Sequence, residues 1–553
     1  MTKHPVIAIG LDAAEPKLIE TWIEQGRLPN LKRLRDRGGY ARLSNHEHYR
    51  AETPWTNFLT GCSPEKTGYW GPVKYFPKTY EVVEVGAYDY QEYQPFYALG
   101  DDYRIAVFDI PQSALSEQAN GPQVLAWGAH SPQTKSESRP PGLLKEMIQK
   151  HGKHPVLLKD FADCRDFEAL AKLQKALMVG IQRRAAICQD LIRRENPDFF
   201  LTIFGETHTA GHYMWHLSQP HPISPSANEV SGDALLEVFQ ETDRAIGDIL
   251  SAAPEEAYFI VFSAHGMDSN VMDLPSMIFL PELLYRWSLP GTIGLGKGTL
   301  GKTPPAPLTR FHKRGWYGDV WGCKHDANWL RGFLRREAPT RLFNRVAPFL
   351  GRSTQPDLES PYEQIAKGDP LFWQPANWYK TRWQDMKAFA LPSFSEGYVR
   401  INLKGREANG IVAPEEYDAV CDEVSQMLHR LTDARTGQPM VREIVRTRTS
   451  ATDSDDKRPD ADLIVLWQEE NATDVVDSPD VGRIGPIPFC RTGSHRADGF
   501  ILAQGEGIAP GSNFPASKAI DLAPTMVALL GAPIPEHFEG RPILTPDLSA
   551  PVA

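Results

Sequence analysis

Two histidines stand four residues apart in the segment FGETHTAGHYMWH at positions 204–216, and an acid precedes them. Residues at positions i and i+4 lie on the same face of a helix, so His208 and His212 can present two imidazoles to one ligand. Imidazole nitrogens are common zinc ligands, and Glu206 lies close by in the sequence. The spacing also suits two hydrogen-bonded histidines packed beneath aromatic residues, so by itself it leaves both interpretations open.

Other segments add side chains of the same chemistry. Asp12 follows the apolar run VIAIGL, His265 lies in VFSAHGM, and His495 lies in the turn-rich stretch RTGSHRADG. A carboxylate and several imidazoles together form a typical set of ligands for a divalent metal. These residues are far apart in the sequence, so they can meet only if the fold brings them to one place.

The elements expected to position these residues are short apolar strands that alternate with amphipathic helices. Continuous apolar runs are typical of strands buried on both faces, and the alternation with helices predicts an α/β fold with a largely parallel sheet covered on both faces. The runs are VIAIGL, RIAVFDIP, DFFLTIFGE and AYFIVFSAHG. Ligands gather at the carboxyl ends of such strands. Four candidate residues lie at or just beyond the ends of these apolar runs: Asp12, Glu206, His208 and His265.

The chain of 553 residues is long enough for one large domain with an insertion. Residues 285–385 are rich in proline, tryptophan, glycine and arginine and show weak periodicity, so we expect an inserted cap there. The core domain is then expected from residues 1–284 and 386–548, where the pattern of strands and helices continues.

The formal charge of −11 argues against a nucleic acid polymer as partner. No apolar run is long enough to cross a bilayer, so we expect no membrane partner. The six cysteines form no CxxC pair, which favours reduced thiols and a cytoplasmic location. A homo-oligomer is left open.

One stretch matches a phosphate-binding pattern by letter alone. GKGTLGKT at 296–303 fits the P-loop spacing, but that loop needs a buried strand before it and a helix after it. Prolines follow at positions 304, 305 and 307, so no helix is expected to start there. We therefore interpret this stretch as a loop.

Taken together, the motifs resemble the alkaline phosphatase superfamily, in its branch of type I phosphodiesterases, nucleotide pyrophosphatases and predicted phosphohydrolases or phosphomutases. The resemblance extends over nearly the whole chain, with the matching pieces in the family's order. In chain order the pieces are GLDAAEPKLIETWIEQGRLPNLKRL, PWTNFLTGCSPEKTGYWG, GETHTAGHYMWH, ETDRAIGDIL with FSAHGM, INLKGREANGIV, GSHRADGFILAQG and DLAPTMVALLGAPIPEHFEGRPI. The resemblance implies a three-layer α/β fold and a metal-dependent phosphoesterase.

Members of that superfamily bind two metal ions, often zinc, beside a serine or threonine nucleophile. Carried over by position, the resemblance implies that His208, His212 and His495 hold one ion. It assigns Asp12, His265 and the nucleophile oxygen to the other ion.

The sequence departs from the family pattern at two ligand positions. His208 stands where the family usually has aspartate, which keeps a ligand and makes a three-histidine set suited to zinc. Ala264 also stands where the family usually has aspartate, and this change removes a ligand. Glu206 and Asp268 are candidates to replace it. We therefore expect one or two zinc ions, with another divalent metal left open.

The nucleophile is also displaced from the family pattern. The family's spacing falls on Ala51, and the nearest hydroxyl is that of Thr53, which precedes a proline at the predicted start of a helix. Helix N-termini favour bound phosphate, and a hydroxyl there is a candidate nucleophile; the alternative is that Thr53 only caps the helix. Arg50 is a candidate contact for a phosphoryl oxygen.

The leading hypothesis is hydrolysis of a small organic phosphate monoester or diester through a covalent phospho-threonine. A phosphotransferase or phosphomutase that uses the same intermediate is an alternative. A non-catalytic binding descendant of the family is a third interpretation, which the missing acid at position 264 would favour.

Overall fold

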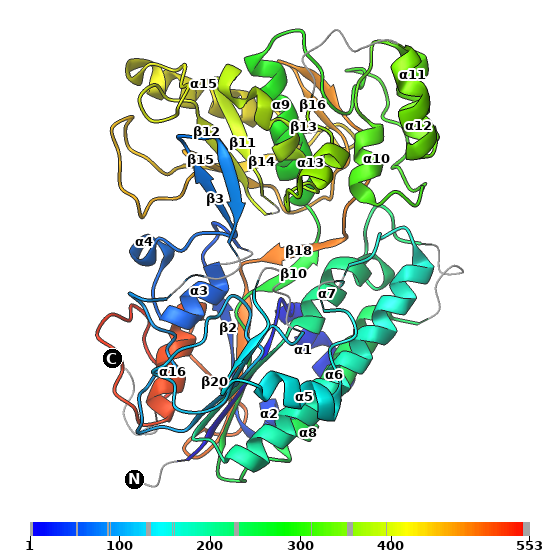
Figure 1. Cartoon of the computed structure of the whole chain (residues 1–553). Helices are drawn as coiled ribbons and strands as arrows, with labels where there is room; N and C mark the ends of the chain where they lie inside the picture. The colour runs from blue at the N-terminus through cyan, green and yellow to red at the C-terminus, as the bar shows by residue number, and fades with distance from the viewer. Residues whose placement is uncertain are drawn as a thin grey trace.

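The computed structural model describes residues 4–50, 53–85, 88, 90–128, 134–157, 159, 161–225, 232–310, 312–350, 358–393 and 395–545. These residues form two lobes, which lie one above the other in Figure 1. The lower lobe contains the central sheet, and the upper lobe contains a smaller sheet with several short helices.

The central sheet follows the order β20-β2-β19-β9-β1-β8-β5-β6-β7, with β21 also paired to β2. Most of its pairs are parallel, and β19 is antiparallel to both of its neighbours. Its strands are β1 (Val6–Leu11), β2 (Gly39–Ser44), β5 (Ile105–Phe108), β6 (Gln123–Leu125), β7 (Glu137–Arg139), β8 (Phe199–Phe204), β9 (Tyr258–Ser263), β19 (Gly499–Gln504), β20 (Ser512–Asn513) and β21 (Ser517–Lys518). The four apolar runs of the sequence are thus the buried strands β1, β5, β8 and β9, which confirms the expected α/β class.

Helices cover both faces of this sheet. Successive side chains of a strand point to opposite faces, and accordingly Ile7 and Ile9 of β1 join one apolar core, while Val6 and Ala8 join another. The first core is covered by α1 (Pro16–Glu24), α2 (Pro29–Arg37), α5 (Leu143–His151), α6 (Phe167–Glu195), α7 (Gly205–Met214) and α8 (Ala234–Leu250). The second is covered by α3 (Thr53–Thr60) and α16 (Leu522–Leu529), with α4 (Pro64–Thr67) following α3.

The two lobes are joined by a pair of short antiparallel strands, β10 (Gly266–Ser269) and β18 (Gly493–Arg496). The chain leaves the central sheet after β9, passes through β10 into the upper lobe, and returns through β18 to β19. The excursion is therefore longer than the insertion expected at 285–385. The strands between 388 and 467 pair with one another in a separate sheet and not with the central sheet.

The upper lobe is organised around the four-stranded sheet β11-β12-β15-β14. Its strands are β11 (Ala388–Leu391), β12 (Gly397–Ile401), β14 (Val441–Arg446) and β15 (Leu463–Trp467), and a small sheet holds β13 (Thr432–Asp433), β16 (Val476–Ser478) and β17 (Gly482–Ile484). Its helices are α9 (Leu280–Ser288), α10 (Trp316–Gly322), α11 (Trp329–Glu337), α12 (Thr340–Val346), α13 (Pro361–Lys367), α14 (Pro375–Trp378) and α15 (Tyr417–His429). Among the described residues no helix combines the length and the apolar character needed to cross a membrane.

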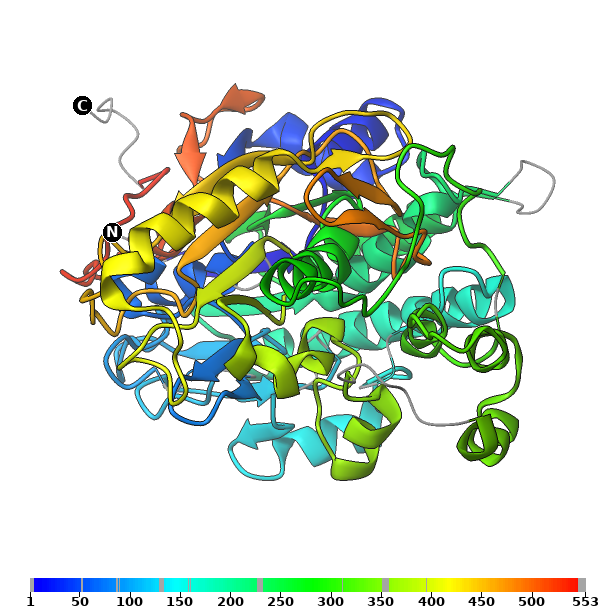
Figure 2. The ribbon, with the colours of Figure 1, turned by 90° about the horizontal axis from the view of Figure 1, so that it is seen from above.

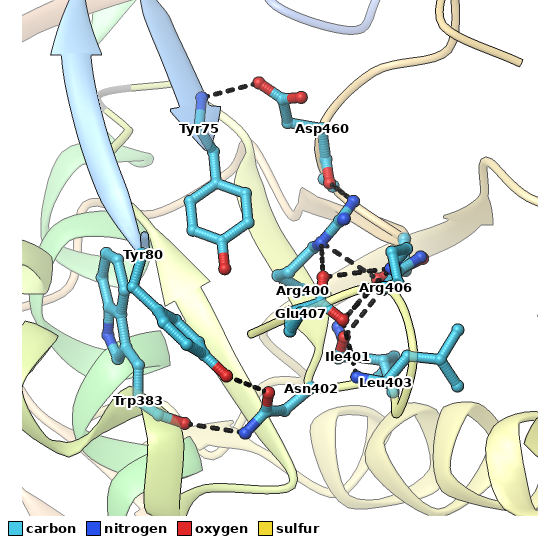
Figure 3. Close-up of polar contacts among 12 residues, drawn as sticks. Tyr75, Tyr80, Trp383, Arg400, Ile401, Asn402, Leu403, Arg406, Glu407 and Asp460 are labelled. Atoms are coloured by element: carbon cyan, nitrogen blue, oxygen red, sulfur yellow. Dashed lines mark hydrogen bonds and ion pairs between the residues drawn. The ribbon is translucent and has the colours of Figure 1, made fainter. Parts of the chain in front are cut away.

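A hairpin from the N-terminal half, β3 (Val73–Phe76) and β4 (Glu81–Glu84), packs into the upper lobe (Figure 3). The backbone N–H of Tyr75 donates to Asp460 at 2.9 Å, and the Tyr80 hydroxyl donates to Asn402 at 2.7 Å. Arg400 donates to Glu407 at 2.7 Å in the same network. The INLKGREANG motif, which includes two of these partners, therefore holds the upper lobe to the segment that follows α3 and α4.

Candidate metal centre

Helix α7 begins directly after strand β8 and carries the first two histidines. The backbone oxygen of Asp12 accepts a hydrogen bond from the Thr207 hydroxyl at 2.7 Å, which ties the start of the helix to the end of β1. Because His208 and His212 are one helical turn apart, they point in the same direction from this fixed helix. Both side chains are buried.

The third histidine reaches the same place from strand β18. His495 Nε2 lies 3.3 Å from His208 Nε2, and His212 Nε2 lies 3.0 Å from His208 Nε2. The three ligand atoms all lie within 4.8 Å of one another. We call these three side chains the imidazole cluster. Zinc–nitrogen bonds of about 2.0–2.1 Å in a tetrahedron place neighbouring ligand atoms about 3.3 Å apart, so the cluster fits a zinc ion.

A close approach of two backbones orients the cluster. His212 Nδ1 lies 2.7 Å from the Gly493 carbonyl oxygen, so Nδ1 carries the hydrogen and Nε2 is left to accept a cation. A Cβ atom on Gly493 would lie 2.2 Å from the Gly211 carbonyl oxygen. Only glycine permits this spacing, and it lets β18 bring His495 beside α7.

A carboxylate and a fourth imidazole lie next to the cluster. Asp12 Oδ1 is 3.6 Å from His265 Nε2 and accepts a hydrogen bond from the Trp55 indole at 3.2 Å. The ring centroids of His265 and His495 are 4.8 Å apart. The Asp12–His265 pair therefore contacts the imidazole cluster through His265 and His495, and the structure brings all five side chains together.

His265 has the properties of a cation ligand. Its side chain is fully buried, and neither ring nitrogen makes a hydrogen bond to the described residues. Burial lowers the pKa of His265 to about 3, so the ring is neutral near pH 7. A buried neutral imidazole without hydrogen bonds is costly unless a cation takes its lone pair.

Position 264 contributes no ligand side chain to this pair. Ala264 is fully buried, and its carbonyl oxygen accepts a hydrogen bond from the Asn45 amide at 3.2 Å. The Asp12–His265 pair therefore holds one carboxylate where the family pattern has two.

Glu206, one expected replacement, is held elsewhere. Both of its carboxylate oxygens accept from Arg184 Nε at 3.1 Å, and His154 Nε2 lies 3.2 Å from one of them. The ion pair with Arg184 keeps the pKa of Glu206 low despite its complete burial. Because Glu206 already neutralises the buried Arg184, it connects α7 to α6 and does not complete the candidate metal site.

Asp268, the other expected replacement, lies on the wrong face of its strand. In the β10–β18 pair Met267 is opposite His495, and Asp268 is opposite Ser494. Neighbouring residues of a strand point to opposite faces, so Asp268 and His495 point away from each other. Met267 packs toward Gly211 of α7, on the side of the cluster.

Thr53 lies in the first turn of α3, two residues before Trp55. The Trp55 indole donates a hydrogen bond to Asp12, so this helix contacts the Asp12–His265 pair. The buried Thr53 hydroxyl donates to the Tyr49 carbonyl at 3.0 Å and lies 3.2 Å from the His48 carbonyl. Ala51, where the family pattern places the nucleophile, lies outside the described residues.

Arg50 is buried in ion pairs with the upper lobe. Its guanidinium lies 3.0 Å from Glu396 and 2.5 Å from Glu469. Two carboxylates already neutralise this cation, so the expected contact with a phosphoryl oxygen would compete with them. Arg50 instead fastens the loop before α3 to the upper lobe.

The sequence analysis did not single out Arg491. Its Nη1 lies 2.9 Å from His212 Nε2, and its Nε donates to Asp273 at 2.6 Å. A guanidinium therefore faces one nitrogen of the imidazole cluster, and a cation binding there requires it to withdraw toward Asp273. Arg491 lies four positions before His495 in the motif RTGSHRADG. Its positive charge in that motif was the signal that could have marked it as a candidate.

The sequence matches the family described as "Type I phosphodiesterase / nucleotide pyrophosphatase" over residues 6–287, which is just over half of the chain. That stretch contains every candidate residue except His495. No curated protein matches the chain.

Among solved structures, the phosphonoacetate hydrolase of Sinorhizobium meliloti 1021 in complex with phosphonoacetate is 14% identical, with 96% of each chain covered and a TM-score of 0.48. Its complex with phosphonoformate gives 14% identity, 96% coverage of each chain and a TM-score of 0.46. Human ectonucleotide pyrophosphatase / phosphodiesterase 5 is 10% identical, with 97% of each chain covered and a TM-score of 0.45. These likenesses are remote and add nothing to the chemistry of the site.

Proposed function

This chain belongs to the type I phosphodiesterase / nucleotide pyrophosphatase family and is a phosphoester hydrolase, and we propose that it cleaves a small organic phosphate monoester or diester through a covalent intermediate on Thr53. The observation that carries the proposal is the meeting of the imidazole cluster with the Asp12–His265 pair beside the first turn of α3. The candidate ligands for a cation and the helix that carries the proposed nucleophile are therefore in contact, through Trp55 and Asp12.

The imidazole cluster supports zinc as the cofactor. Three buried imidazoles with one tetrahedral position open form a zinc set known from hydrolytic enzymes, and the nitrogen spacings of 3.0 and 3.3 Å fit it. When bound, such an ion polarises a phosphoryl oxygen and stabilises negative charge that develops in the reaction. The incomplete Asp12–His265 pair supports one tightly held ion, with a second bound weakly.

The remaining chemistry is assigned to residues of this chain. Thr53 Oγ1 gives up its proton to solvent and bonds to phosphorus, while the bond from phosphorus to the leaving oxygen breaks and that oxygen takes a proton from solvent. Water then hydrolyses the phospho-threonine, which releases phosphate and restores the Thr53 hydroxyl. For the attack, the Thr53 hydroxyl must turn from the Tyr49 carbonyl, to which it now donates. The Trp55 indole donates a hydrogen bond to Asp12 and so keeps its carboxylate in orientation.

The test compares two threonines on the same helix. Thr53→Ala is expected to abolish hydrolysis of p-nitrophenyl phosphate and its diester while leaving the zinc content unchanged. Thr56→Ala, one turn further into α3, is the matched control and is expected to retain most of the activity. Mass spectrometry of wild-type protein quenched during turnover should find a phosphoryl group on the peptide that contains Thr53. Normal turnover by Thr53→Ala, or a phosphoryl group on another residue, would refute the assignment.

We further propose a small-molecule partner and a cytoplasmic location. A small-molecule substrate is supported by the burial of all five candidate metal ligands. All six cysteines are free, which supports a reducing compartment such as the cytoplasm.

A further inference from the structure

Helix α11 of the upper lobe has its apolar and charged faces reversed. Trp329, Leu330 and Phe333 fall within one arc of about 100° on a helical wheel, and all three are exposed. Trp329 is 76% exposed and Phe333 is 46% exposed. A surface helix of a globular protein normally turns such side chains inward.

Arginines occupy the inward face instead. Arg331 and Arg335 are buried, and Asp326 accepts hydrogen bonds from both, at 2.6 Å from Arg331 Nε and 2.7 Å from Arg335 Nη2. The inward side of α11 is thus held by ion pairs between its arginines and Asp326. This packing leaves the apolar side chains of the helix facing solvent, and their exposure calls for an explanation.

The segment after α11 extends the exposed apolar surface. Leu342 of α12 is 50% exposed, and Phe349 in the short 3-10 helix Ala347–Leu350 is 87% exposed. The Arg335 guanidinium packs 5.3 Å from the Phe343 ring, and Asn328 donates to the Leu350 carbonyl at 3.0 Å. Residues 329–350 therefore form one held unit, which we call the 329–350 hairpin.

The sequence segment that leads into and contains this hairpin has a net charge opposite to that of the whole chain, although its Arg331 and Arg335 are buried. Residues 296–350 contain eleven lysines and arginines and three aspartates and glutamates, whereas the chain carries a formal charge of −11. The one acid on the outward side of α11, Glu337, is paired with Arg310 at 2.8 Å and with Arg336 at 3.1 Å. Arg345 is exposed beside the apolar residues of α12.

We propose that the 329–350 hairpin binds the surface of a bilayer that contains anionic phospholipid, with its exposed apolar side chains in the interfacial layer. Tryptophan, phenylalanine and leucine combined with arginine are the composition of helices that lie in that layer, and anionic lipid complements the local positive charge. The hairpin stands at the outer margin of the upper lobe in both views, where a flat surface can reach it (Figures 1 and 2).

This inference is independent of the proposed function. The expectation of no membrane partner came from the lack of a spanning segment, and surface binding needs none. A second copy of this acidic chain is the competing occupant, since it also offers negative charge. Lipid is favoured because the exposed residues combine tryptophan, phenylalanine and leucine with arginine, which is the composition of helices that lie in the interfacial layer.

The experiment measures sedimentation of the full-length protein with vesicles of phosphatidylcholine alone or mixed with phosphatidylglycerol. Wild-type protein is expected to bind the mixed vesicles, less so at high salt, and to bind phosphatidylcholine poorly. The double variant Trp329→Ser/Phe349→Ser is expected to lose about tenfold or more in its partition coefficient, because two aromatic side chains no longer enter the interface. Hydrolysis of p-nitrophenyl phosphate in solution should be unchanged.

The matched control is Phe76→Ser, which removes a 43% exposed aromatic residue from β3 on another part of the surface. It should bind mixed vesicles like wild type. Equal binding by the double variant, or no binding by wild type, would overturn the proposal. So would a dimer, seen by light scattering, that the double variant converts to monomer without any lipid binding, because the surface would then belong to a second copy.

Discussion

The two halves of the candidate metal centre differ in how many possible ligands the protein itself supplies. The imidazole cluster has three converging nitrogens, from His208, His212 and His495, held by a helix and a strand that touch through glycines. The Asp12–His265 pair has one carboxylate and one imidazole, and beside them stands Ala264. The cluster can hold a cation without further help, whereas the pair needs the substrate or the nucleophile to complete it.

The difference teaches that the change at position 208 and the change at position 264 act in opposite directions. Histidine at 208 retains a ligand and completes a uniform nitrogen set, while alanine at 264 removes a negative charge from the other half. Because carboxylates contribute much of a site's attraction for a divalent ion, the pair should bind its ion more weakly than the cluster does.

Removing a ligand from the complete half should have the largest effect. His208→Ala is expected to lose the tightly bound zinc and to lower the rate of hydrolysis by about a thousandfold, because the charge-stabilising ion is absent. Elemental analysis of purified protein alongside the rate measurement checks both expectations. The control, His151→Ala, removes a histidine that pairs with Asp190 far from the site.

Zinc content and the rate of hydrolysis measured on Asp12→Asn test whether the two halves bind their ions differently. If the halves differ as described, this variant keeps its tightly bound zinc, whereas His208→Ala does not. Equal zinc loss in both variants would show that the two halves bind their ions as one unit.

Restoring the missing acid should make the halves alike. Ala264→Asp places an unpaired carboxylate at a fully buried position, so the metal-free variant should be less stable by about 2–4 kcal/mol. Added zinc should restore the stability and raise the bound metal from one ion to two. Thermal unfolding with and without zinc, together with elemental analysis, checks this.

The control is Ala264→Asn, which has a similar size but no charge. Zinc should recover much less of its stability. Equal recovery in the two variants would mean that a polar side chain is sufficient and that charge is not what the pair lacks.

The sequence predicted the elements of the lower lobe well because their patterns are local. VIAIGL became β1 and DFFLTIFGE became β8, since a continuous apolar run reflects the burial of a strand on both faces. The separate sheet that holds the strands 397–401 and 463–467 was not predicted, because membership of a sheet depends on long-range pairing, which a local pattern does not encode.

The candidate ligands were predicted from motifs, but the residues that contact them were not. Glu206 looked available because it precedes His208, and only the fold shows Arg184 reaching it from α6. Arg491 was overlooked although it lies in the motif of His495, since nothing in the sequence tells which way its side chain turns. The direction of a side chain is set by packing partners distant in the chain.

The pH dependence of folding tests a buried histidine next to the imidazole cluster. His216 lies one turn after His212, with Nδ1 2.9 Å from the Thr492 hydroxyl, and burial lowers its pKa to about 4. The unfolded chain binds this proton below a pKa of about 6.5 and the folded chain does not, so folding stability falls as the pH drops from about 6.5 to 4.

His216→Gln should remove this contribution. The loss of stability between pH 7.5 and pH 5 is expected to be smaller by about 2 kcal/mol than in wild type. Urea unfolding at the two pH values measures the difference. An unchanged pH slope in His216→Gln would show that His216 does not contribute to the acid sensitivity of folding.

The smallest expected effect concerns the guanidinium that faces the cluster. Arg491 Nη1 lies 2.9 Å from His212 Nε2, so it both occupies the lone pair and repels an incoming cation. Arg491→Gln removes the positive charge and should tighten zinc binding by about tenfold, measured by competition with a chelator. Arg491→Lys keeps the charge and should stay close to wild type. Weaker zinc binding in Arg491→Gln would mean that Arg491 mainly orients His212. The imidazole cluster would then need Arg491 to hold its geometry, just as the Asp12–His265 pair needs a further ligand.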